Sequence, residues 1–156
     1  MVHTMYNTAL NNIARYSMGI CRTIKSMLGP VVLRDIIDEE AKNSGKAKAD
    51  KLSLSENPAY DLAMLLESML KEFDTKDIAI NQEPSSVTVN NLVCGCLPPF
   101  ITQAEEFDFG EKEARDYACR RCMPSYKAAS HLLKIMFKGR LTEEGCFMQF
   151  YKNERL

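Results

Sequence analysis

Two close pairs of cysteines set the strongest condition on how this chain folds. Cys94 and Cys96 flank a single glycine, two arginines separate Cys119 from Cys122, and 22 residues lie between the two pairs. Zinc favours four thiolate ligands in a tetrahedron, and two short pairs are an economical way for one chain to supply them. We therefore expect the fold to bring Cys94, Cys96, Cys119 and Cys122 around one zinc ion.

The same cysteines leave other interpretations open. They could form a dithiol or disulfide switch, or they could be unrelated thiols. Arg120 and Arg121 would lower the pKa of the neighbouring thiols, because a positive charge favours the thiolate, and this helps metal capture and redox reactivity equally. If one cysteine is out of reach, the open coordination position becomes available for catalysis or sensing.

Length and composition predict one folded domain over residues 1–156. The chain is 46% hydrophobic and 26% charged, which is ordinary for a globular protein. A net charge of −1 gives no basic field for phosphate backbones, so nucleic-acid binding is disfavoured. No apolar run approaches the ~20 residues of a membrane span and no secretory signal is present, so we expect a cytoplasmic protein without a membrane span.

The absence of a signal also argues against a disulfide framework, which six cysteines would allow in a secreted chain. Residues 1–34 carry basic but no acidic side chains, a composition shared with organelle transit peptides. The same segment also reads as a core helix.

The first half of the chain, residues 1–73, has helical periodicity. Between residues 4 and 28 one side of a helix is apolar, with Tyr6, Ala9, Leu10, Ile13, Ile20, Ile24, Met27 and Leu28. Gly29 and Pro30 break this helix and start a second one, because proline is tolerated in a first turn. We expect the second helix to end at residues 43–45 and residues 46–56 to form a loop or a flap.

A third helix is expected after Asn57 and Pro58, which suit an N-cap and a first turn. Its apolar stripe is Ala59, Leu62, Leu65, Leu66, Met69 and Phe73. Over residues 76–96 the period changes from 3.6 to 2, first around Ile80 and then around Val89, which predicts a β-hairpin that delivers the chain to Cys94.

Residues 97–156 are expected to form a cysteine-bearing loop, a helix and a final strand. The helix is expected to start afresh at Pro124 and to end at Gly139, and the strand to cover residues 146–151. The fold class is therefore α+β, with an antiparallel sheet packed against several helices.

Single residues add little chemistry outside the cysteine pairs. Cys21 lies at the edge of an apolar stripe, which indicates a small buried side chain. His131 is expected on the surface and His3 lies at the terminus, so a hydrolase that needs a histidine base is poorly supported. No glycine-rich phosphate loop is present.

From Leu62 onward the order of elements resembles the 4-vinyl reductase domain family, small ligand-binding domains related in fold to transport-particle subunits and haem nitric oxide sensors. The similar features are the helix before a hairpin, the strand that ends near Cys94, a cysteine at 119 or 122 before the helix 124–138, and the closing strand with Cys146. The resemblance implies an antiparallel sheet packed against helices, frequent homodimers and a pocket for a small apolar molecule. It places Cys119 or Cys122 at the pocket and Cys146 on the final strand. The closing strand also looks like that of thiazoline-carboxylate hydrolase relatives.

Together these features predict a zinc-bearing small-molecule binding or sensory domain, homodimeric, with a pocket for an apolar ligand. The alternatives are an enzyme, a hydrolase or a reductase, that acts on a small substrate through a cysteine such as Cys146, and a helical protein-interaction module.

Overall fold

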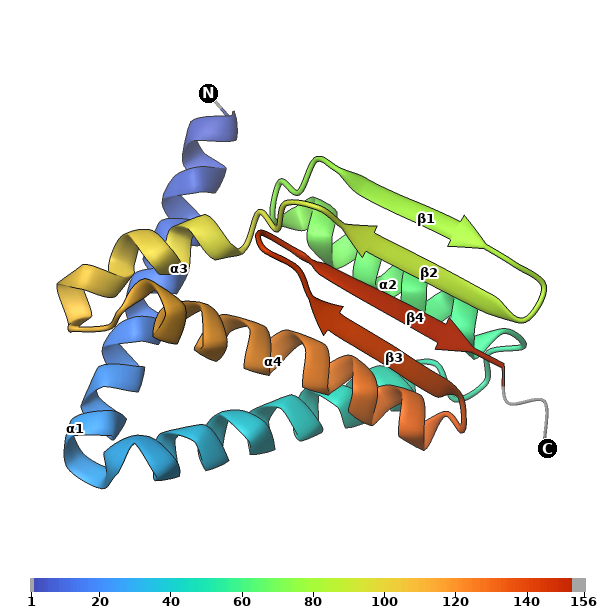
Figure 1. The fold of residues 1–156 in the computed structure, drawn as a ribbon, viewed down its shortest axis with the longest axis horizontal. Helices are drawn as coiled ribbons and strands as arrows, with labels where there is room; N and C mark the ends of the chain where they lie inside the picture. Colours follow the sequence, from blue (N-terminus) through green and yellow to red (C-terminus); the bar gives the residue numbers. More distant parts are fainter. Residues whose placement is uncertain (1, 153–156) are drawn as a thin grey trace.

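The computed structural model describes the backbone of residues 2–152 and the side chains of residues 8–152. Its elements in chain order are the helices α1 (Val2–Lys51) and α2 (Pro58–Glu72), the strands β1 (Ile78–Gln82) and β2 (Ser86–Asn91), the helix α3 (Leu97–Ala104) with the 3-10 turn η1 (Glu105–Phe107), the helix α4 (Glu111–Leu132), and the strands β3 (Met136–Leu141) and β4 (Cys146–Tyr151). The predicted α+β class is confirmed (Figure 1).

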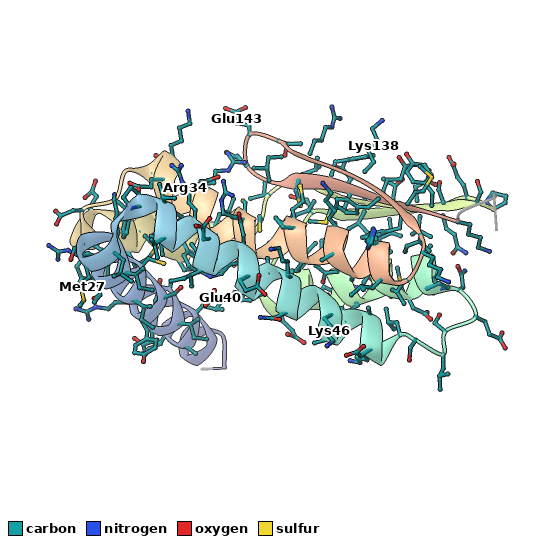
Figure 2. The ribbon with its side chains drawn as sticks, turned by 90° about the horizontal axis from the view of Figure 1, so that it is seen from below. Met27, Arg34, Glu40, Lys46, Lys138 and Glu143 are labelled. Atoms are coloured by element: carbon teal, nitrogen blue, oxygen red, sulfur yellow. The ribbon has the colours of Figure 1, made fainter. Side chains whose placement is uncertain are left out.

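The four strands form one antiparallel sheet in the order β1-β2-β4-β3. Alternate side chains of β2 and β4 are buried, among them Val87, Val89, Met148 and Phe150. These side chains share one face because successive residues of a strand point to opposite sides. The helices cover that face, and the opposite face, which carries Lys138, is left uncovered (Figures 1 and 2).

The buried apolar side chains form two cores. The first joins α2 to the sheet and to the end of α4, with Leu66, Tyr126 and Phe150. The second joins the start of α1 to the start of α4, with Met18 and Tyr117. Helix α4 therefore runs through both cores and holds them together.

Helix α1 is longer than predicted. The break at Gly29 and Pro30 is confirmed, because Gly29 has a φ of 89° and α1 kinks there into two arms. The predicted end at residues 43–45 and the predicted loop from residue 46 are wrong, since the helix continues to Lys51. A Cβ at Gly45 would lie 2.6 Å from the Ser125 carbonyl oxygen, so this glycine serves the close approach of α1 to α4 instead of a stop.

The first arm of α1 packs through a different side than expected. Leu10 of the predicted stripe is buried, together with Ala14, Met18 and Cys21, whereas Ile13, Ile20, Met27 and Leu28 of that stripe are exposed. The side chain of Tyr6 lies outside the described residues. This arm is apolar on two sides, and periodicity alone does not select the side that packs.

The predictions for α2, the hairpin and the closing strand agree with the structure. Helix α2 begins at Pro58 after Asn57, although Asn57 makes no capping hydrogen bond through its side chain. Its side chains Ala59, Leu62 and Leu66 are buried as expected. The hairpin and the closing strand over residues 146–151 are confirmed.

The predicted helix over residues 124–138 is wrong at both ends. Pro124 lies inside α4, which is one helix from Glu111 to Leu132. Lys134 adopts a φ of 56°, which turns the chain back, and Met136 begins the strand β3. Phe137 lies opposite Phe150 in the sheet, so its apolar side chain packs in a strand and not on the face of a helix.

Candidate functional site

The first cysteine pair lies in the turn between β2 and α3. The N–H of Cys94 donates to the carbonyl of Glu144 at 2.9 Å, and the N–H of Gly95 donates to Oγ1 of Thr75 at 3.0 Å. These two hydrogen bonds tie the turn to the β3–β4 hairpin and to the end of α2. Leu97 follows as the first residue of α3, whose first turn tolerates Pro98 and Pro99. The turn is therefore held in place from both sides.

The second pair lies on α4. Cys119 and Cys122 are three residues apart, so they share one side of the helix. Cys146 is the first residue of β4 and is buried, with its Sγ 3.9 Å from the amide nitrogen of the buried Asn91. A turn, a helix and a strand thus each contribute thiols.

These thiols meet at one cavity of about 260 Å³. Cys94, Cys96, Cys119, Cys122 and Cys146 all line it, and most of the remaining wall is apolar, as at Leu70, Phe73, Leu97, Phe100 and Met148. The two cysteine pairs therefore line the same cavity, and Cys146 joins them, while their closure around one zinc ion stays a prediction. All six cysteines are free thiols in this structure.

Burial raises the pKa of four of these thiols, those of Cys96, Cys119, Cys122 and Cys146. It raises the pKa of Cys96 to about 12 and that of Cys146 to about 11, and the neighbouring thiols add to both shifts. The pKa of Cys119 is also raised by burial, and that of Cys122 lies well above its usual range for the same reason. A low-dielectric environment disfavours the thiolate, so at neutral pH these four cysteines carry neutral sulfur.

The predicted effect of the two arginines is wrong. Nη1 of Arg120 lies 3.1 Å from Oδ1 of Asp38, and Nε of Arg121 lies 3.2 Å from Oε2 of Glu40. Because both guanidinium groups pair with carboxylates, burial decides the pKa of the thiols beside them.

The described side chains do not form a metal site. Among the described residues, no group of three or more His, Cys, Asp or Glu side chains is arranged so that it could hold a metal ion. His131 is exposed as expected, and the side chain of His3 lies outside the described residues. The structure gives zinc no support, and zinc binding by Cys94, Cys96, Cys119 and Cys122 stays a prediction.

Cys21 and Lys48 lie outside the two cysteine pairs. Cys21 is fully buried in the second core, as predicted, with its Sγ 3.3 Å from Nη2 of Arg121. Lys48 lines the cavity and was missed, because residues 46–56 were expected to form a loop. The signal that could have found it is the spacing of Ala41, Gly45 and Ala49, small residues that continue the buried side of α1.

Comparison of the chain with protein-family models, with curated proteins and with solved structures gave no match. None of the described helices is long and apolar enough to cross a membrane.

Proposed function

We propose that this protein binds a small apolar molecule in the cysteine-lined cavity. The observation that carries the proposal is the cavity itself, which is walled mostly by apolar side chains and by thiols from a turn, a helix and a strand. A cavity of ~150 Å³ takes up benzene, so about 260 Å³ accommodates about ten non-hydrogen atoms. This is near the lower end of known ligand pockets.

A variant that fills the cavity tests this function. Ala118 lines the cavity from α4, so Ala118→Phe would place a ring in the ligand space. With octan-1-ol as the probe, we expect calorimetric titration to show binding to the native chain and at least a tenfold loss in the variant, because the ring and the probe need the same volume.

Ala79→Phe is the matched control, since Ala79 is an exposed residue of β1 that does not line the cavity. It should bind octan-1-ol like the native chain. Absence of octan-1-ol binding to the native chain, or equal binding to both variants, would contradict the proposal.

The raised pKa values of four cavity thiols argue against the enzyme alternative. A nucleophilic or redox-active cysteine reacts as the thiolate, and burial disfavours the thiolate at Cys96, Cys119, Cys122 and Cys146. The neutral thiol packs as a small apolar group, which suits a binding wall.

Zinc, the homodimer and the similarity to the 4-vinyl reductase domain family stay predictions. The zinc prediction rests on the spacing of the two cysteine pairs in the sequence, and support for a second subunit is the set of exposed apolar side chains on α1, Ile13, Tyr16, Ile20, Met27 and Val31. Native mass spectrometry of freshly purified protein should show one zinc ion per chain and two chains per particle. A metal-free particle would refute the zinc prediction, and a single chain would refute the dimer.

A further inference from the structure

Lys48 brings a positive charge to the wall of an otherwise apolar cavity. The second arm of α1 lies along α4, and Lys48 is half-buried between them. Its Nζ donates to Oγ of Ser44 at 2.7 Å and to Oγ of Ser125 at 3.1 Å, and it lies 4.9 Å from the centre of the Tyr126 ring. These contacts hold the ammonium group beside the cavity.

The charge of Lys48 has no counter-ion in the described part of the chain. Arg121, the other cation that lines the cavity, is paired with Glu40 at 3.2 Å. No ion pair of Lys48 occurs among the described residues, and no Asp or Glu lines the cavity. A buried charge without a partner is costly, and burial accordingly lowers the pKa of Lys48.

The hydrogen-bonding groups around Lys48 are only partly used. Two of the three ammonium hydrogens go to the two serine hydroxyls, and the third has no hydrogen-bond acceptor among the described residues. Ser125 donates its own hydrogen to the carbonyl of Cys122 at 2.7 Å. Ser44, which is exposed, accepts from Lys48 and makes no donation within the described chain. One ammonium hydrogen and one hydroxyl hydrogen are thus available side by side.

We propose that the ligand of the cavity is an apolar monocarboxylic acid whose carboxylate binds Lys48 and the hydroxyl of Ser44 while its apolar part lies among the cysteines. This inference rests on the proposed function and adds the charge of the ligand to it. A carboxylate accepts both available hydrogens and supplies the missing counter-ion. Because Ser44 is exposed, the carboxylate lies at the outer end of the cavity and the chain of the acid points inward.

Octanoate, octan-1-ol and octylamine separate the charge of the ligand from its apolar part. All three have about ten non-hydrogen atoms, which matches the volume of the cavity. In calorimetric titrations we expect octanoate to bind at least tenfold more tightly than octan-1-ol, and octylamine to bind more weakly than either, because a charge-assisted hydrogen bond to a buried cation is worth about a factor of ten or more.

Lys48→Met should lose at least tenfold in octanoate affinity and keep its affinity for octan-1-ol within about twofold. Lys48→Gln, which keeps a hydrogen-bond donor but no charge, should show the same loss, and the unfolding temperature of each variant establishes that it is folded. Lys46→Met is the matched control, because Lys46 is an exposed lysine on the same helix that does not line the cavity (Figure 2).

The outcomes distinguish the two proposals. Equal binding of octanoate and octan-1-ol, or octanoate binding that survives both Lys48 substitutions, overturns this inference and leaves the proposed function intact. Failure of all three probes to bind the native chain overturns the proposed function itself.

Discussion

Replacing Gly95 by alanine should lower the free energy of unfolding by about 3 kcal/mol. Gly95 lies between Cys94 and Cys96, and a Cβ there would be 1.9 Å from the carbonyl oxygen of Phe73 and 2.9 Å from the backbone nitrogen of Thr75. Both neighbours are backbone atoms at the end of α2, so no side-chain rotation can relieve the overlap. The turn has to move, and the hydrogen bond from Gly95 to Thr75 is lost with it.

Gly110→Ala is the control for this experiment. Gly110 precedes α4, and a Cβ there would meet no atom within 4 Å. Its substitution should cost less than about 1 kcal/mol, the scale of an N-cap effect. Urea unfolding of both variants measures the difference. Equal midpoints for the two variants would mean that the turn does not pack against α2, and the placement of Cys94 and Cys96 at the cavity would then be wrong.

The protein should lose stability steeply above pH 9. A thiol whose pKa is raised by folding stabilises the native state fully below the pKa of the unfolded chain, and this stabilisation is lost as the pH rises through the folded value. For Cys146 the pKa rises from 9.0 to about 11, so the loss runs over that interval. It amounts to about 2 kcal/mol at the upper end. The raised pKa values of Cys96, Cys119 and Cys122 act in the same direction.

Comparison with Cys146→Ala removes the contribution of Cys146, together with the part of the raised pKa of Cys122 and of Tyr126 that its charge causes. The variant should lose about 2 kcal/mol less than the native chain between about pH 8 and pH 11. Urea midpoints across that range provide the measurement. Parallel pH profiles for the two chains would show that Cys146 is not buried in the native state.

The sequence predicts the site better than it predicts the elements around it. One cysteine pair lies on a turn and the other on a helix. The predicted strand that ends before Cys94 already indicates that the first pair lies just beyond the end of that strand. The sequence predicts the strand that begins at Cys146, and the structure adds that Cys146 lines the cavity. These are local patterns. A local pattern predicts an element correctly where one face of that element is buried.

The missed features depend on contacts between distant segments. A glycine often marks the end of a helix. Only the contact of Gly45 with α4 shows why α1 continues here. Met136 and Phe137 suit the apolar face of a helix as well as that of a strand, and the positive φ of Lys134 decides between them. Lys48 could not be assigned to the cavity before the path of α1 was known, so the proposed charge of the ligand depends on the structure.

The bridging of two cores by α4 has a consequence for how the molecule would respond to an occupant. The cavity takes wall residues from both cores, with Phe100 against the second and Leu70 and Met148 in the first. A molecule bound there would contact both cores, so its binding should couple their unfolding more strongly than α4 alone does. Hydrogen exchange would then report slower opening in α1 and in the sheet at once, at sites far from any direct contact.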